Sequence, residues 1–144
     1  MIRIVAVGRM KDRSLAALLE DYVKRIRALA PVELVELRDQ DPEREGKAMV
    51  AKLGSARGNS LVVALDEKGE DVTSRGLSRL LGGHGGLTFL VGGADGLGSA
   101  ARERADRTLR LSSLTLTHEM ARVLLAEQVY RGLCILRGKP YHRD

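Results

Sequence analysis

The chain has 144 residues, of which 44% are hydrophobic, 30% are charged and 3% are aromatic, and its formal net charge at pH 7 is +5. This size suits one domain with a proper hydrophobic core and excludes two domains of ordinary size. The mild basic excess favours an anionic partner such as nucleic acid, while the few aromatic residues argue against folds that stack RNA bases on an aromatic sheet.

Strands and helices are predicted to alternate along the chain. Ile2–Val7 is a β-branched run typical of a strand, and apolar residues recur at helical spacing over 15–29. Val32–Leu37 predicts a second strand, and Asp41 before Pro42 predicts the N-cap and first turn of a second helix. The remaining expected elements are strands at Leu61–Leu65, Leu87–Val91 and near Leu109–Leu111, with short helices around Leu77–Leu81 and from Ser99.

This alternation predicts an α/β fold. A chain that alternates strands and helices implies a mostly parallel sheet with helices on both faces. No internal repeat, low-complexity tract or linker interrupts the pattern. Residues 1–144 are therefore expected to form a single domain.

The helix expected from His118 to Leu136 differs from the others because apolar residues cover nearly its whole circumference. A surface helix of a small monomer would show one polar face. This excess of apolar side chains predicts a homodimer in which the helix packs against the same helix of a second copy. The alternative is a central buried helix in a monomer. Glu127 on this helix is expected to pair with Arg131 or Arg122.

Other classes of protein are disfavoured by what the sequence lacks. The longest apolar runs are strand-sized or broken by charges, and no cleavage signature follows the first one, so a soluble cytoplasmic protein is expected. The one cysteine, Cys134, excludes an internal disulfide and reads as a buried thiol. His84, His118 and His142 have no ligand spacing among themselves or with Cys134, so no metal site is expected.

Three strand ends carry unusual sequence, and ligands bind at the carboxyl ends of strands in parallel sheets. These segments are 65–69, the glycine-rich 91–96, and 111–117, which alternates hydroxyl and leucine side chains. They are candidates for one shared pocket, although tight turns explain the glycines equally well. Gly96–Ala101 also matches a relaxed dinucleotide fingerprint, but it follows the fourth strand and no acidic residue ends the next one, so a nucleotide-binding module stays an alternative.

A basic cluster and the terminus are candidates for contact with RNA. The cluster consists of Arg102, Arg104, Arg107 and Arg110. It is either a patch that faces RNA or an ordinary solvated face. The chain ends in Tyr141-His142-Arg143-Asp144, which places a phenol, an imidazole and a guanidinium where a terminus normally frays. Since Pro140 narrows the backbone just before it, the tail is either an aimed segment or a loose polar end.

Five motifs, in order, resemble one known family. They are Val5–Gly8, Leu65–Glu67, Gly92–Leu97, Leu111–Leu116 and Pro140–Arg143. The set resembles the bacterial 23S ribosomal RNA (pseudouridine-N3) methyltransferases of the SPOUT superfamily, over essentially the whole chain. The resemblance implies an α/β fold with a deep trefoil knot at its carboxyl end, a homodimer, S-adenosylmethionine as cofactor, and ribosomal RNA or the ribosome as partner. A non-catalytic ribosome-associated RNA-binding protein is the second alternative.

The same resemblance implies the site residues. Tyr141, His142 and Arg143 would reach the target nucleotide across the dimer interface. His142 would orient the base or accept its proton. Arg143 would stabilise negative charge or hold a phosphate. The chain departs from the family pattern at Thr117, where proline is usual, and at Glu70, where lysine is common. The cofactor would be held by Leu65, Gly92, Ser112, Ser113, Leu114, Thr115, Leu116 and Thr117.

Overall fold

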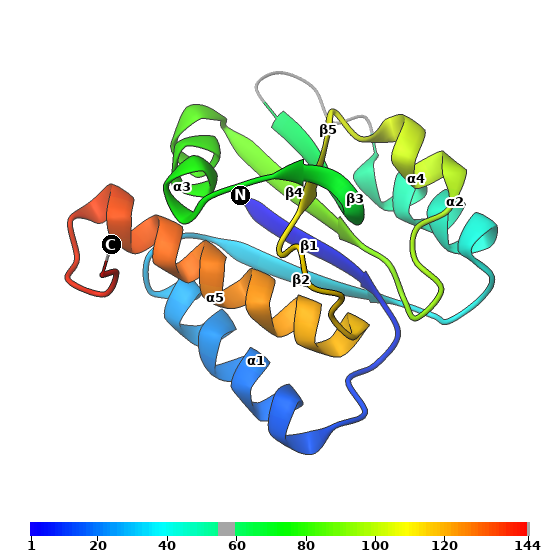
Figure 1. Ribbon diagram of the computed structural model, residues 1–144, viewed down its shortest axis with the longest axis horizontal. Coiled ribbons are helices and arrows are strands. Elements are labelled where there is room, and N and C mark those ends of the chain that lie inside the picture. Colours follow the sequence, from blue (N-terminus) through cyan, green and yellow to red (C-terminus); the bar gives the residue numbers. More distant parts are fainter. Residues whose placement is uncertain (55–59, 144) are drawn as a thin grey trace.

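The computed structural model describes residues 1–54 and 60–143, which form a parallel sheet flanked by helices (Figure 1). The strands of this sheet follow the order β2-β1-β4-β3-β5, and neighbouring strands pair in parallel. The elements, in chain order, are β1 (Ile2–Val7), α1 (Arg13–Arg27), β2 (Val32–Leu37), α2 (Pro42–Leu53), β3 (Ser60–Asp71), α3 (Ser74–Gly83), β4 (Gly86–Val91), α4 (Ser99–Arg104), β5 (Arg107–Arg110) and α5 (His118–Arg137).

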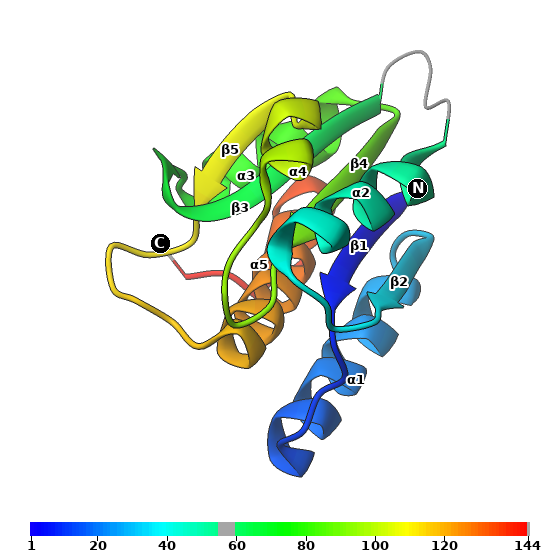
Figure 2. The same cartoon turned by 90° about the vertical axis from the view of Figure 1, so that its right-hand side faces the viewer.

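Helices cover both faces of the sheet, as Figure 2 shows. Successive strand residues point to opposite faces, so Ile4 packs with α1, α3 and α5, while Val5 packs with α2 and α4. Both residues are fully buried. The prediction of an α/β fold with a parallel sheet is therefore confirmed, whereas the knot stays a prediction because strand order and register do not define how the chain threads.

Helix ends follow from local chemistry. The Asp41 carboxylate accepts the Arg44 N–H at 2.9 Å, and Pro42 occupies the first turn of α2, as the sequence predicts. Gly138 ends α5 with φ 67°, in the left-handed region that glycine adopts most easily. The tail therefore leaves α5 in a defined direction.

Strand β3 is longer than the predicted Leu61–Leu65 and continues as a polar segment to Asp71. Its pairing with β5 shifts register between Leu65 and Glu70. A Cβ on Gly69 would lie 2.7 Å from the backbone carbonyl carbon of Leu109, so the two strands approach too closely for a side chain there. The sequence pattern missed this extension because its residues carry no apolar alternation.

Helix α5 lies between α1 and α3 (Figure 1). Its buried side chains pack with both helices and the sheet in one core, which accounts for much of its apolar circumference within a single chain. This arrangement matches the alternative of a central covered helix, so the apolar pattern of α5 does not by itself require a second copy. Within the described part of the chain, neither α5 nor another helix is long and apolar enough to cross a membrane.

Candidate functional site

The carboxyl ends of β3, β4 and β5 surround an open pocket of about 630 Å³. All three segments singled out from the sequence contribute to its wall. Ser113 is exposed and is not among the lining residues. The expected cofactor-binding residues that do line the pocket are Leu65, Gly92, Ser112, Leu114, Thr115, Leu116 and Thr117.

The glycine-rich loop after β4 is folded tightly onto itself. A Cβ on Gly92 would lie 2.6 Å from the carbonyl carbon of Gly96 and 3.0 Å from the Leu97 nitrogen, closer than real side chains come. Gly96 has φ 82°, which strains other residues. The loop is thus both a tight turn and a pocket wall.

The dinucleotide fingerprint has a packing explanation. A Cβ on Gly98 would lie 2.1 Å from the Pro42 carbonyl oxygen, because α4 begins directly against the start of α2. The Ser99 hydroxyl and N–H both bond the Glu43 carboxylate, at 2.7 and 3.1 Å. These bonds hold the pKa of Glu43 below its usual value. Gly98 and Ser99 therefore join α4 to α2.

The segment after β5 uses two of its hydroxyl groups to shape its own backbone. The Ser112 hydroxyl accepts the Leu114 N–H at 2.9 Å. The Thr117 hydroxyl accepts the Met120 N–H at 3.2 Å and caps α5. Thr117 thus supplies a side-chain cap that a proline at this position would lack.

The basic cluster is largely neutralised by acids at the end of β3. Arg102 pairs with Asp66 at 2.9 Å, and Arg107 pairs with Glu70 at 3.1 Å. The Arg110 guanidinium bonds both carboxylate oxygens of Asp71, at 2.5 and 3.1 Å, which lowers the pKa of the Asp71 carboxyl. Glu70 therefore forms an ion pair between β3 and β5. The pocket also takes in Asp66, Glu67 and Lys68 of the candidate segment 65–69, Arg102 and Arg110 of the basic cluster, and His118 and Ala121, which the sequence did not point to as pocket residues.

The first turns of α5 are fixed to the strand ends beside the pocket. Arg122 is 1% exposed, and it donates to Glu36 Oε2 at 2.8 Å and to the carbonyl oxygens of Val7 and Gly8 at 2.8 and 3.0 Å. Glu119 accepts the backbone N–H groups of Lys11 and Asp12 at 3.0 and 3.1 Å. Of the two expected partners of Glu127, Arg122 is therefore not the one that pairs with it, because its guanidinium is directed to β1 and β2.

We expect Arg122→Met to lower the free energy of unfolding by about 2–4 kcal/mol, because it leaves two buried carbonyl groups and one carboxylate without their donor. Chemical denaturation measures this loss. The matched control is Arg13→Met on the exposed start of α1, which is expected to change stability by less than about 0.5 kcal/mol. Equal effects of the two substitutions would contradict the role of Arg122.

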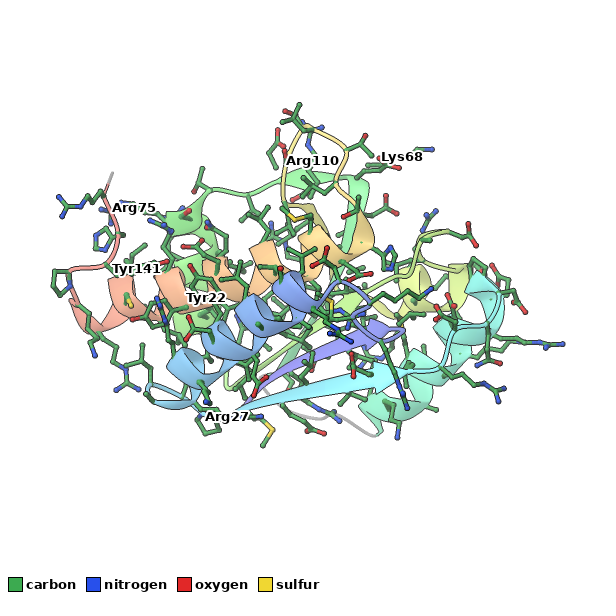
Figure 3. The ribbon with its side chains drawn as sticks, turned by 90° about the horizontal axis from the view of Figure 1, so that it is seen from below. Tyr22, Arg27, Lys68, Arg75, Arg110 and Tyr141 are labelled. Atoms are coloured by element: carbon green, nitrogen blue, oxygen red, sulfur yellow. The ribbon has the colours of Figure 1, made fainter. Side chains whose placement is uncertain are left out.

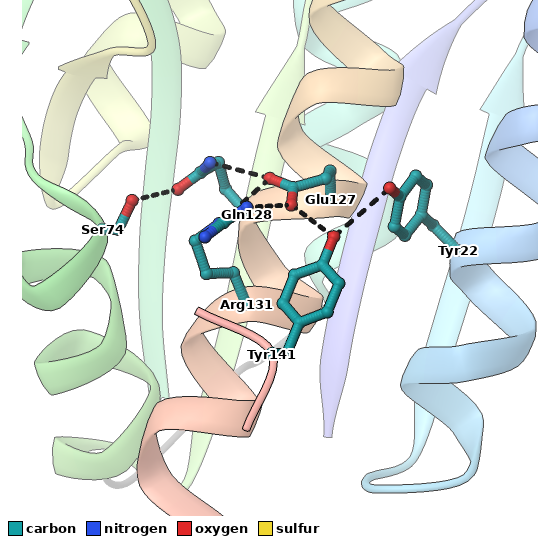
Figure 4. A network of polar contacts seen from close by, with 6 residues as sticks. All are labelled: Tyr22, Ser74, Glu127, Gln128, Arg131 and Tyr141. Atoms are coloured by element: carbon teal, nitrogen blue, oxygen red, sulfur yellow. Dashed lines mark hydrogen bonds and ion pairs between the residues drawn. The ribbon is translucent and has the colours of Figure 1, made fainter. Parts of the chain in front are cut away.

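The terminal residues lie away from the pocket of their own chain. Residues 138–143 are not among its lining residues. In Figure 3, Tyr141 lies towards one end of the molecule, whereas Lys68 and Arg110, which line the pocket, lie nearer the middle of its long axis. The Tyr141 hydroxyl donates to Glu127 Oε2 at 2.6 Å, as Figure 4 shows. Asp144 lies outside the described residues.

The Glu127 carboxylate pairs with Arg131 at 2.8 Å, which confirms one of the two predicted partners. The thiol of Cys134 is buried, as expected. In the part of the chain that the structure describes, no group of three or more histidine, cysteine or acidic side chains is arranged to hold a metal ion.

Together, the fold and the pocket define an α/β protein with a ligand site at the carboxyl edge of a parallel sheet. A family model described as "Predicted SPOUT methyltransferase" matches residues 1–142. The chain therefore belongs to the SPOUT methyltransferase family.

Relatives match over nearly their full length. A protein of Polynucleobacter asymbioticus is 43% identical over 99% of both chains, and one of Anaeromyxobacter is 40% identical over 99% of both. Each is named Ribosomal RNA large subunit methyltransferase H.

Two solved structures share the fold. AviRb, a SpoU methyltransferase of Streptomyces viridochromogenes in complex with AdoMet, has a TM-score of 0.52 at 15% identity, covering 90% of this chain and 56% of that one. This chain thus spans little more than half of AviRb. A probable methylase family protein of Haemophilus influenzae has a TM-score of 0.55 at 16% identity, covering 95% and 66%.

Family membership confirms the predicted class of enzyme, a methyltransferase that uses S-adenosylmethionine. The pocket fits this molecule in size and chemistry. Its volume of about 630 Å³ lies in the range of small-molecule sites. Its wall carries the hydroxyl side chains of Ser112, Thr115 and Thr117, which are groups able to bond a polar ligand, and both Glu67 and Lys68, whose charges complement a zwitterionic amino-acid group.

Proposed function

We propose that the protein uses S-adenosylmethionine to methylate N3 of a pseudouridine in 23S ribosomal RNA, in the cytoplasm, as a homodimer with one SPOUT-type domain of residues 1–144 in each subunit. The observation that carries this proposal is the match over 99% of both chains to relatives named as methyltransferases of the large-subunit ribosomal RNA. The pocket at the three strand ends agrees with it.

A second copy is proposed because the pocket and the tail are separated within one chain. Helix α5 has 20 residues and is therefore about 30 Å long. Its first residue, His118, lines the pocket, whereas the tail follows its last turn. Because the tail and the pocket of one chain lie at opposite ends of α5, the tail that meets the cofactor in a given pocket would come from another subunit. Apolar side chains left for contact with such a subunit include Leu18, Leu114 and Met120, which are 43%, 74% and 44% exposed.

The reaction requires loss of the N3 proton of the base and alignment of that nitrogen with the methyl group. The cofactor, when bound, supplies a methyl group activated by its sulfonium. The pocket residues, including Leu65, Gly92 and segment 112–117, would orient it. His142 is proposed to orient the base or accept its proton, since an imidazole can act as a hydrogen-bond partner or as a general base. Arg143 would steady the negative charge that develops on the base oxygens.

The paired arginines are expected to contribute little to RNA binding, since each already faces a carboxylate. We expect Arg107→Ala to change the affinity for ribosomal RNA by less than about twofold and to leave the slope of log K against log salt concentration nearly unchanged. Filter binding at several salt concentrations measures both. A slope reduced by about one unit would show instead that Arg107 contacts a phosphate.

The proposal is tested by methyl transfer. Ribosomes or 23S ribosomal RNA lacking the modification are incubated with the protein and radiolabelled S-adenosylmethionine, and the modified position is mapped by mass spectrometry of nuclease fragments. Label at N3 of a pseudouridine is the expected result. Label on another base would contradict the proposed site, and binding without transfer would favour a non-catalytic RNA-binding protein.

A further inference from the structure

All three tyrosines of the chain lie in one cluster. The sequence contains three tyrosines, and they are Tyr22 on α1, Tyr130 on α5 and Tyr141 in the tail. The rings of Tyr130 and Tyr141 meet edge to face at 4.7 Å between centroids. The rings of Tyr22 and Tyr130 lie 6.2 Å apart. Aromatic pairs at these distances attract each other beyond their burial of surface.

The hydroxyl groups of the cluster form a directed chain of hydrogen bonds (Figure 4). The Tyr141 hydroxyl donates to Glu127 at 2.6 Å. The Tyr22 hydroxyl lies 3.3 Å from the Tyr141 oxygen. Because Tyr141 has one proton and gives it to Glu127, Tyr22 must be the donor in the second bond.

The network continues from α5 to α3. Glu127 also accepts from Arg131 at 2.8 Å and from Gln128 at 2.8 Å. Gln128 in turn accepts from the Ser74 hydroxyl at 2.6 Å. The Tyr141 phenol is therefore held by groups whose own positions are fixed by three helices.

Two cations complete the cluster. The Arg131 guanidinium lies 4.9 Å from the centre of the Tyr141 ring, and that of Arg25 lies 5.1 Å from the Tyr22 ring. Such cation–π contacts help to hold the two tyrosine rings in place. Burial and the bond to Glu127 raise the pKa of Tyr141, so its hydroxyl stays a proton donor at neutral pH.

Tyr141 attaches the tail to the body of the protein. Tyr141 and His142 are half-buried, whereas Lys139, Pro140 and Arg143 are exposed. A phenol enclosed by Glu127, Tyr22 and Tyr130 has its hydroxyl and one ring face already engaged. This placement does not suit a group that must also contact a nucleotide.

We infer that the three tyrosines and Glu127 form a latch that fixes the root of the tail, with Tyr22 and Tyr130 as positioning residues for Tyr141. Tyr141 thus anchors the tail instead of touching the target base, and the contact with the nucleotide falls to His142 and Arg143. This last step rests on the proposed function. The latch itself is a property of the folded chain.

The first test monitors the environment of Tyr141 by ¹⁹F NMR and does not depend on methyl transfer. Because the protein contains only three tyrosines, incorporation of 3-fluorotyrosine gives three ¹⁹F signals, which the three Tyr→Phe variants assign. Tyr22→Phe is expected to shift the Tyr141 signal and narrow it towards that of a mobile ring. Ser14→Ala, which removes an exposed hydroxyl from the same helix, is expected to leave it unchanged. A Tyr141 signal unaffected by Tyr22→Phe would overturn the latch.

The second test is a double-mutant cycle on methyl transfer to ribosomes that lack the modification. Tyr22→Phe is expected to lower kcat by roughly 2- to 12-fold, the effect of one neutral hydrogen bond, while cofactor affinity stays within about twofold. In a Tyr141→Phe background, Tyr22→Phe is expected to have almost no further effect, because the shared bond is already lost. If the reductions in kcat caused by the two substitutions multiply in the double variant, the two tyrosines act independently. That result would overturn the inference and would assign Tyr141 to contact with the nucleotide.

Failure of the latch and failure of the proposed function are distinguishable. If the protein methylates another substrate or none, the ¹⁹F signal still reports whether Tyr22 holds Tyr141. If methyl transfer occurs at the proposed site but the signal does not respond, the function stands and the latch is wrong.

Discussion

Removal of residues 141–144 is expected to reduce methyl transfer by more than about 100-fold while the protein stays folded and binds S-adenosylmethionine normally. Misplacing the groups that position a substrate by about an ångström can lower the reaction rate by a factor of this size. The truncation removes His142 and Arg143 altogether. The pocket is unaffected because residues 138–143 do not line it. Initial rates on unmodified ribosomes and calorimetric titration of the cofactor measure the two effects.

A double substitution, His142→Ala with Arg143→Ala, separates chemistry from anchoring. It keeps Tyr141 and its bond to Glu127, so the root of the tail should stay in place. We expect this variant to be nearly as inactive as the truncated protein. Activity close to that of the intact chain, in either variant, would mean that the tail takes no part in the reaction.

Gly92→Ala is expected to weaken the binding of S-adenosylmethionine by more than about 30-fold. The new Cβ would lie 2.6 Å from the Gly96 carbonyl carbon, 2.7 Å from its oxygen and 3.0 Å from the Leu97 nitrogen. All three are backbone atoms, so the loop can relieve the clash only by moving, and the pocket wall moves with it. Calorimetry with the cofactor measures the loss.

Gly83→Ala is the matched control for this substitution. A Cβ on Gly83 meets nothing within 4 Å, and its backbone has no positive φ. Cofactor affinity should stay within about twofold of that of the unmodified protein. If Gly92→Ala binds the cofactor as tightly as Gly83→Ala does, the glycine loop is not part of the cofactor site.

The convergence of the strand ends could be foreseen because parallel strands place their carboxyl ends at one edge of the sheet. This reasoning and the family resemblance predicted that Leu65, Gly92 and segment 112–117 lie at one site, and all of them except Ser113 line the pocket. The order of the strands could not be foreseen, since the periodicity of a strand contains no information about its neighbours. The extension of β3 to Asp71 was missed for a related reason, as its acidic residues are stabilised by arginines of β5 that are remote in sequence.

Roles that depend on a distant partner were the hardest to predict. The sequence left Arg131 and Arg122 both open as partners of Glu127; Arg131 forms the pair, whereas the Arg122 guanidinium binds Glu36 and the end of β1. Tyr141 looked like a substrate-facing phenol, yet its hydroxyl is bonded to Glu127. Sequence spacing reports neighbours along a helix, whereas both of these contacts are made between elements.

The central claim is that the pocket of one subunit and the tail of another form one methyl-transfer site. It is tested most directly by mixing two impaired proteins, Gly92→Ala and the chain lacking residues 141–144, after dissociation and reassociation of subunits, at a cofactor concentration too low to saturate Gly92→Ala. In a mixed dimer, the truncated subunit contributes an intact pocket and the Gly92→Ala subunit an intact tail. We predict recovery of roughly a quarter of the activity, since random pairing makes about half of the dimers mixed, each with one complete site. No recovery, with mixed dimers confirmed by mass spectrometry, would contradict the claim.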